Sequence, residues 1–248
     1  VVPNMVRKAP PIERTGETEH FVDEWSIRWE RPGSAGYFHA AGAPLSGDVT
    51  ERDLDAFTWP DTAAPGLFEG IVDEARRHAE AGCAVILECI CAGIFEMACR
   101  LRGVEQFYMD LAMNPSLACA LLDRLLELKI AFYEAAGEHL GEYVQFIREG
   151  DDVAGQESLL MSPAMYRELI KPRHRRLFEA QRKAFPEPFF IWFHSDGAIR
   201  EILPDFIEIG VEVLNPLQLT ARGMDAEEVK REFGRDLAFW GAGVDTQH

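Results

Sequence analysis

The chain has 248 residues, 47% of them hydrophobic, which is enough for one large or two small domains with a sizeable core. Its formal net charge of −17 argues against a nucleic-acid partner, which requires a basic face. The sequence shows no apolar run that predicts a membrane helix and no pattern that predicts a signal peptide. Five cysteines, an odd number confined to residues 83–119, predict reduced thiols in a cytoplasmic protein.

The first 66 residues form the first predicted segment. Residues 1–20 are polar and show no periodicity, so we expect them to be irregular. Aromatic and polar residues alternate over 24–39, which predicts a β-hairpin. Thr50 and Asp53 have the spacing of a capping box and predict a short helix within the connector that follows.

From residue 67 the pattern alternates between strand and helix. Strands are predicted at 84–91, 143–152, 189–193, 211–216 and 236–242. Helices are predicted at 68–81, 93–101, 104–113, 115–139, 164–171, 172–184, 198–209 and 225–233. This alternation indicates βα units around a parallel sheet, hence an α/β fold.

A complete (β/α)8 TIM barrel needs about 250 residues. We therefore predict a barrel that is truncated at both ends over residues 67–248 and that forms a single domain with residues 1–66. A doubly wound sheet is the alternative. It is less favoured because the sequence has no Gly-rich phosphate loop.

Polar side chains follow each predicted strand. The carboxyl ends of barrel strands meet at one mouth, so we expect these groups to converge there and to form a functional site. His194 and Asp196 are two residues apart and share a face of an extended chain. The complete set is Glu88, Cys89, Cys91, Glu149, Asp151, Asp152, His194, Ser195, Asp196, Asn215, Gln218, Gly241, Gly243 and Asp245.

Two chemistries are open at this mouth. A histidine with carboxylates and nearby thiols is suited to a divalent metal, with zinc the first choice. Alternatively, adjacent carboxylates share protons, and one acts as a general acid with a raised pKa.

Each of these residues also has a structural interpretation. Cys89 and Cys91 could be small buried hydrophobic residues. Asp151 and Asp152 could form a turn, and Asp196 could cap the helix that follows it.

Basic groups lie elsewhere in the chain. His78 and His174 have arginine neighbours on helices and are expected to be solvated. The basic island Lys171–Arg176 is either a solvated helix face or a contact for a phosphate, a carboxylate or an acidic protein. His248 is the last residue and carries no prediction.

Several blocks in order resemble the uroporphyrinogen decarboxylase superfamily. The clearest are Gly150–Gln156 (Gly-Asp-Asp-Val-Ala-Gly-Gln) and Phe193–Gly197 (Phe-His-Ser-Asp-Gly). Others are Ala92–Glu96, Leu101–Gly103, Leu160–Pro163, Leu169–Pro172, Leu214–Pro216 and Gly241–Asp245. The resemblance implies a (β/α)8 barrel. It also implies one of two activities: decarboxylation of uroporphyrinogen without a cofactor, or zinc-dependent methyl transfer between corrinoid proteins and thiols or methyl donors.

The resemblance also implies roles for individual residues. His194 matches the histidine of the methyltransferases' His-x-Cys zinc motif, and Asp196 stands where the cysteine would be. We therefore predict zinc on His194 and Asp196. The predicted catalytic residues are Asp151, Asp152 and His194, and the predicted substrate-binding residues are Glu88, Glu149, Asn215 and Gln218.

The first predicted function is transfer of a methyl group between a small methylated substrate and a corrinoid protein or thiol. The runner-up is decarboxylation of a tetrapyrrole, which would require cationic groups in a mouth that the sequence predicts to be acidic. The third is a non-catalytic barrel that binds a small ligand or a partner.

Overall fold

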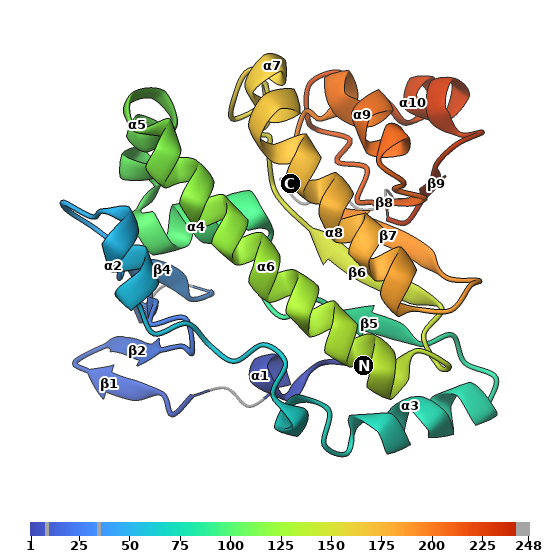
Figure 1. The fold of residues 1–248 in the computed structure, drawn as a ribbon. Coiled ribbons are helices and arrows are strands. Elements are labelled where there is room, and N and C mark those ends of the chain that lie inside the picture. The colour runs from blue at the N-terminus through green and yellow to red at the C-terminus, as the bar shows by residue number, and fades with distance from the viewer. Residues whose placement is uncertain (8–9, 34–35, 242–248) are drawn as a thin grey trace.

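A computed structural model describes residues 1–7, 10–33 and 36–241 (Figure 1). Two sheets organise the molecule. An antiparallel sheet has the order β1-β2-β3-β4, and a parallel sheet has the order β5-β6-β7-β8-β9. The N-terminal strands are β1 (Glu13–Thr15), β2 (Thr18–Val22), β3 (Arg28–Arg31) and β4 (His39–Gly42).

The prediction that residues 1–20 are irregular is wrong. They contain helix α1 (Asn4–Arg7) and the β1–β2 hairpin, whose tight turn uses φ +62° at Gly16. The hairpin predicted over 24–39 is present as β3 and β4, but its strands lie a few residues later. Sequence periodicity missed β1 and β2 because β1 is exposed and β2 is mostly half-buried, so neither short strand has a fully buried face to mark it.

The connector contains the predicted short helix, α2 (Glu51–Ala56). Its capping box is confirmed, because the Thr50 backbone N–H donates to the Asp53 carboxylate at 2.8 Å. A 3-10 turn, η1 (Pro65–Leu67), and helix α3 (Ile71–Glu80) then lead into the parallel sheet.

All five predicted parallel strands are present; β7 has the predicted length and begins one residue later, and the other four are shorter than predicted. They are β5 (Ile86–Glu88), β6 (Phe146–Gly150), β7 (Phe190–His194), β8 (Val213–Asn215) and β9 (Ala238–Phe239). Each strand pairs in parallel with the next one along the chain. This is the strand order of a barrel, whereas a doubly wound sheet reverses direction at a switch point. The doubly wound alternative is therefore wrong.

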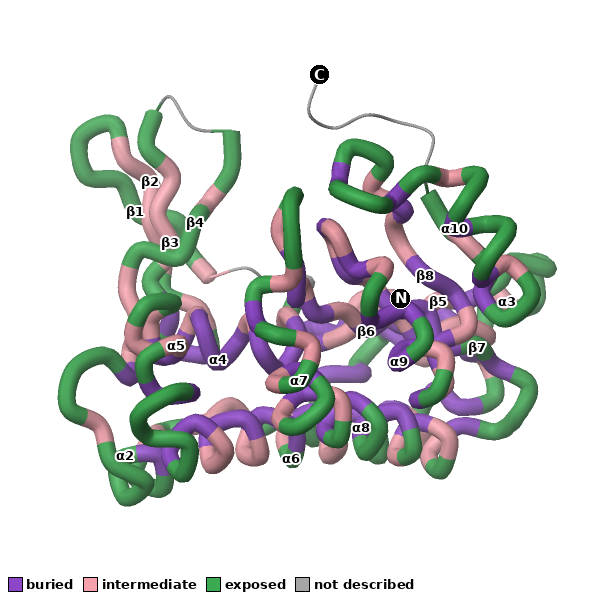
Figure 2. The backbone as a smooth tube through the Cα atoms, turned by 90° about the horizontal axis from the view of Figure 1, so that it is seen from above, coloured by how far each residue is buried: buried purple, intermediate pink, exposed green. Residues whose placement is uncertain are grey.

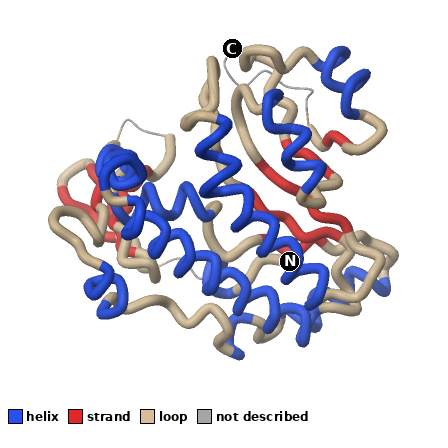
Figure 3. Tube along the Cα trace, turned by 45° about the horizontal axis from the view of Figure 1, so that its top comes forward, coloured by secondary structure: helices blue, strands red, loops and turns tan. Residues whose placement is uncertain are grey.

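Long helices cover one face of this sheet. Helices α6 (Pro115–Leu140) and α8 (Lys171–Ala184) lie side by side against it (Figures 1 and 3). Strand side chains alternate between the two faces, so Glu149 and Phe193 point toward these helices while Arg148 and His194 point to the opposite face. The remaining helices are α4 (Ile94–Arg102), α5 (Val104–Met113), α7 (Pro163–Met165), α9 (Leu203–Glu208) and α10 (Ala226–Phe233), with a π-helical turn η2 (Tyr166–Ile170) and a 3-10 turn η3 (Arg200–Ile202).

One hydrophobic core connects the two sheets. It runs from Trp25 and Ile27 in the N-terminal segment to Val229 and Leu237 near the end of the described chain. Figure 2 shows these buried residues concentrated between α6, α8 and the parallel strands. Among the helices of the described residues, none is both long and apolar enough to cross a membrane. The division at residue 66 within a single domain remains a prediction.

Candidate functional site

A cavity of about 540 Å³ lies between the N-terminal sheet and the mouth of the parallel sheet. The mouth contributes polar residues from β5, β6, β7 and α4, and the N-terminal segment contributes an aromatic wall. The principal lining residues are Glu88, Cys89, Cys91, Glu96, Arg100, Arg148, Glu149, Asp152 and His194 on one side and Phe21, Trp25 and Trp29 on the other.

His194 lies at the end of β7 with its ring held in one tautomer. Its Nδ1 is 2.7 Å from Oδ1 of Asn215, and the Asn215 amide is itself oriented because Nδ2 donates to the Trp240 carbonyl at 2.6 Å. An amide oxygen only accepts, so Nδ1 carries the hydrogen and Nε2 has a free lone pair. A neighbour that fixes the second ring nitrogen in this way is typical of metal-binding histidines.

The free Nε2 faces two carboxylates. It is 3.8 Å from Oδ1 of Asp152 and 4.0 Å from Oδ2 of Asp196, which is too long for hydrogen bonds. One donor atom from each of the three residues lies within 4.8 Å of the others. Burial raises the pKa of Asp152, and the Asp196 N–H and His194 oppose this effect.

These three donors fit a divalent cation. Imidazole nitrogen and carboxylate oxygen are both zinc ligands, and three protein donors leave a coordination position open, as in catalytic zinc sites. The sequence predicted His194 and Asp196 as ligands, and the geometry adds Asp152 as a third donor. Asp152 comes from the neighbouring strand end, so no local motif marked it as a ligand.

Asp151 points away from the cavity and is fully buried. Its carboxylate accepts the N–H groups of Phe95 at 2.8 Å and Glu96 at 2.9 Å, and Nε2 of His174 is 3.0 Å away. It therefore caps the first turn of α4 from a distant part of the chain. At Gly93 a Cβ would lie 2.1 Å from this carboxylate, so glycine is required there. A catalytic role for Asp151 remains a prediction.

The expectation that His174 is solvated is wrong. The side chain is 1% exposed and packs between Phe178 and Phe193. The buried positions Ile170, His174, Leu177 and Phe178 follow the i, i+4, i+7, i+8 spacing of an apolar helix face, and this signal was available in the sequence. His78 is exposed, as expected.

The Glu149 side chain forms its hydrogen bonds on the face of the sheet that α6 covers. Lys129 and Tyr133 of α6 both donate to its carboxylate at 2.8 Å, and all three side chains are buried. The ion pair compensates the charge of Glu149. Sequence analysis missed Lys129 because a single lysine in a long helix is usually solvated.

Two arginines line the mouth, which the sequence predicted to be acidic. Arg148 donates to Glu88 at 2.8 Å, and Arg100 donates to Glu96 at 3.1 Å. Each guanidinium is thus matched by a carboxylate on the same wall. Burial, with Asp151 and Asp152 nearby, raises the pKa of Glu96 to about 7.

Asn215 and Gln218, predicted to bind substrate, hold the loop after β7. Asn215 orients His194, and Oε1 of Gln218 accepts the Gly197 N–H at 2.7 Å. Ser195 is buried, and its hydroxyl has no hydrogen-bond partner within the described residues. Gly243, Asp245 and His248 lie outside the described residues.

The cysteines of the mouth are partly buried and line the cavity. Burial raises the pKa of the Cys89 thiol to about 12 and that of Cys91 to about 11. Both are therefore neutral thiols at physiological pH, in keeping with the interpretation as small hydrophobes.

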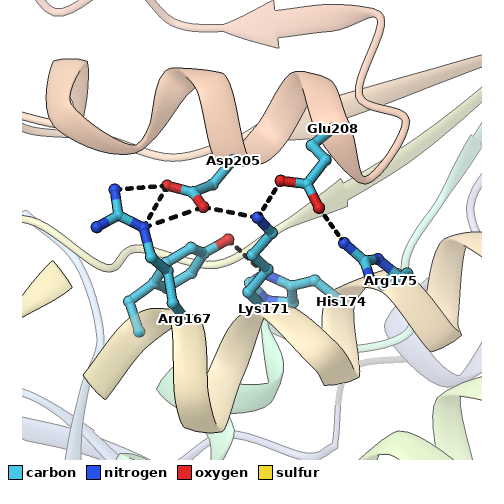
Figure 4. A network of polar contacts seen from close by, with 7 residues as sticks. Arg167, Lys171, His174, Arg175, Asp205 and Glu208 are labelled. Carbon is cyan, nitrogen blue, oxygen red and sulfur yellow. Dashed lines mark hydrogen bonds and ion pairs between the residues drawn. The ribbon is translucent and has the colours of Figure 1, made fainter. Parts of the chain in front are cut away.

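The basic island is largely paired within the chain, as Figure 4 shows for the contacts between α8 and α9. Lys171 contacts Asp205 and Glu208, and Arg175 contacts Glu208. Arg173 pairs with an aspartate of α6, Asp123. These ion pairs hold helices together, so they provide no evidence for a partner-binding face.

Comparisons with known proteins place the chain in a family. The sequence profile of uroporphyrinogen decarboxylase (URO-D) matches residues 38–242. A methylated-thiol–coenzyme M methyltransferase of Methanosarcina mazei is 26% identical over 173 residues, which cover 68% of this chain and 43% of that protein. The chain thus spans less than half the length of this curated relative.

A solved methyltransferase from Methanosarcina mazei has the same fold, with a TM-score of 0.63 and 18% identity over 88% of this chain and 60% of that one. The strand order identifies the described sheet as part of a (β/α) barrel, although five strands do not show a closed one. Since the profile matches most of the chain, the chain belongs to the uroporphyrinogen decarboxylase (URO-D) family.

Proposed function

We propose that this chain is part of a methyltransferase that moves a methyl group between a small methylated substrate and a corrinoid protein or a thiol. The names of the matched relatives support this reaction class. The observation that carries the proposal is the His194 ring, held as one tautomer with Nε2 facing Asp152 and Asp196 at the edge of the cavity. This arrangement offers three donors to a metal and leaves the adjacent cavity open to a substrate.

The residues of the chain have distinct tasks in this proposal. Bound at Asp152, His194 and Asp196, zinc would act as a Lewis acid on the group that gains or loses the methyl. Asn215 accepts Nδ1–H of His194 and so directs Nε2 toward the two carboxylates. Glu96, on the same wall with a pKa of about 7, holds a proton that it exchanges with the bound substrate.

The decarboxylase alternative receives no support from the described site. A tetrapyrrole with several carboxylates needs unpaired cations, and Arg100 and Arg148 are each engaged by a glutamate. The excess of carboxylates along the cavity would repel such a substrate.

Metal analysis combined with an activity assay tests the proposal. We expect about one zinc ion per chain in the full-length protein, and demethylation of methylcobalamin in the presence of a thiol. His194→Ala should lose both, whereas His78→Ala, at an exposed histidine of α3, should lose neither. Metal-free protein that decarboxylates a porphyrinogen would refute the proposal, and absence of both metal and turnover would support a non-catalytic barrel.

A further inference from the structure

The cavity wall is unusually rich in negative charge. Its acidic lining residues are Asp23, Glu24, Glu88, Glu96, Glu149 and Asp152, whereas its basic ones are Arg100 and Arg148. Lys129, which pairs with Glu149 behind the wall, reduces the excess of negative charge to three. When Asp196 of the cluster is added and Glu96 is taken as protonated, as proposed above, the excess among the described residues stays at three. A divalent ion at the cluster would then leave one negative charge, so the cavity favours a cation over a neutral or anionic ligand.

The opposite wall is aromatic. Phe21 and Trp29 come from β2 and β3 of the N-terminal sheet, and Trp25 comes from the turn between these strands. Indole rings attract cations at their faces, and one cation already lies there, because the Arg100 guanidinium carbon is 5.3 Å from the Trp29 ring centroid. Asp23 and Glu24 precede Trp25 on this aromatic side, and neither has an ion-pair partner among the described residues. Aromatic rings beside such carboxylates favour a methylated cation whose charge is spread over apolar methyl groups.

Trp25 provides a second, independent indication of a ligand. This residue is 2% exposed and lines the cavity, yet its indole Nε1–H has no hydrogen-bond partner among the described residues. A buried donor without an acceptor is unfavourable. A ligand oxygen would satisfy it.

We infer that the cavity binds a small methylated onium compound, a quaternary ammonium or sulfonium, that also carries an oxygen acceptor. This substrate class rests on the proposed methyl-transfer function. The aromatic wall lies outside residues 38–242, the part matched by the family profile. Selection of the onium group is thus assigned to the N-terminal segment and not to the part that the profile matches.

Choline and its neutral isostere 3,3-dimethylbutan-1-ol test the inference, because they share shape and hydroxyl and differ in charge. Titration calorimetry of the full-length protein should show choline binding at least about tenfold more tightly. Raising the salt concentration should weaken choline binding only. Glu24→Gln, at an exposed edge of the cavity, should weaken choline about threefold and leave the isostere unchanged. Glu134→Gln, on the outer face of α6, should change neither.

Equal affinity for the two compounds, absence of choline binding, or tighter binding of benzoate would each overturn the inference. A methylcobalamin assay run in parallel separates the two proposals. Methyl transfer from a neutral methylated thiol without choline binding would retain the methyltransferase and reject the onium substrate. Selective choline binding without any methyl transfer would retain the ligand class and reject the reaction.

Discussion

Asp151 is the residue whose predicted chemical role and observed geometry differ most. Its buried carboxylate holds two N–H groups of α4 and the His174 ring. Asp151→Asn replaces one acceptor oxygen by a donor that faces these hydrogens. We expect the free energy of unfolding in urea to fall by about 2–4 kcal/mol.

Asp225→Asn is the matched control for this substitution. Asp225 caps α10 locally by accepting the Glu228 N–H at 2.9 Å, and asparagine is an equally good N-cap. The Asp225→Asn variant should therefore unfold at nearly the same urea concentration as the wild type. If Asp151→Asn were as stable as this control but inactive, Asp151 would be a catalytic group and not a structural one.

Asn215 is expected to control metal affinity without being a ligand. Asn215→Leu removes the acceptor for Nδ1–H of His194, so the ring is free to take the other tautomer. We expect the zinc affinity, measured by competition with a chelator, to fall by about 10- to 100-fold. Gln218→Leu perturbs the same loop through Gly197 but leaves the His194 ring bonded, and it should change the affinity far less.

Thiol reactivity should reflect burial. The pKa of Cys91 is raised from 9.0 to about 11, which lowers its thiolate fraction at pH 8 about a hundredfold. Because the folded state holds this proton more tightly, Cys91 also lowers stability as the pH rises from about 9 to 11. Peptide mapping after iodoacetamide treatment at pH 8 should find exposed Cys83 modified first. Faster modification of Cys91 would show that a nearby cation stabilises its thiolate.

The sequence was sufficient to predict those site residues that lie together at the end of one strand. His194 and Asp196 follow one strand at a spacing of two, so their convergence is local. Asp152 joins them only because β6 and β7 pair with Gly150 beside His194, and no local pattern encodes that register. The same reason explains why the Lys129–Glu149 pair, formed between a helix and a strand, was missed.

Among the elements, the contact between α8 and α9 allows a matched pair of substitutions. Asp205 is buried and bonded by Arg167 and Lys171, whereas Glu208 on the same helix is exposed. Asp205→Asn leaves the largely buried Lys171 ammonium without its counter-charge. It should lower the free energy of unfolding by about 2–3 kcal/mol at pH 7. Glu208→Gln should cost much less.

The effect of Asp205 should depend on pH. Burial raises the pKa of this carboxyl, but its bonds with Arg167 and Lys171 outweigh burial, so the pKa lies below its ordinary value of 3.8. Its stabilising contribution is thus complete above 3.8 and is lost as the pH falls through the lower folded-state pKa. The difference in urea midpoint between wild type and Asp205→Asn should shrink toward pH 2. A constant difference would mean that packing, and not charge, causes it.

Elements with a strongly periodic hydrophobic pattern could be predicted from the sequence, and elements that depend on contacts between distant residues could not. The 26-residue α6 has a continuous buried stripe, so its existence and length were read closely from the sequence. Strands β5, β6 and β8 are shorter than predicted, because buried residues continue beyond them in turns at the mouth. Ile90 follows β5 in this way and is 2% exposed.

At the scale of the whole molecule, the barrel strand order was predictable because five βα units recur with a regular spacing. The position of the N-terminal sheet was not. Trp25 and Ile27 belong to the same core as the parallel sheet, but this packing depends on contacts between distant parts of the chain. The aromatic wall of the cavity is a consequence of that packing.

A continuous core predicts that the two sheets unfold together. In a Trp192→Phe/Trp240→Phe variant, which removes the two tryptophans of the parallel sheet, Trp25, Trp29 and Trp59 report on the N-terminal segment. Far-UV circular dichroism is dominated by α6 and the helices around the parallel sheet. We expect tryptophan fluorescence and circular dichroism to give coincident urea transitions, because neither sheet can expose its share of the core alone. Ile27→Ala, at a fully buried contact between the sheets, should shift both transitions by the same amount. Separate transitions, with Ile27→Ala shifting only the fluorescence signal, would show that residues 1–66 fold as an independent unit.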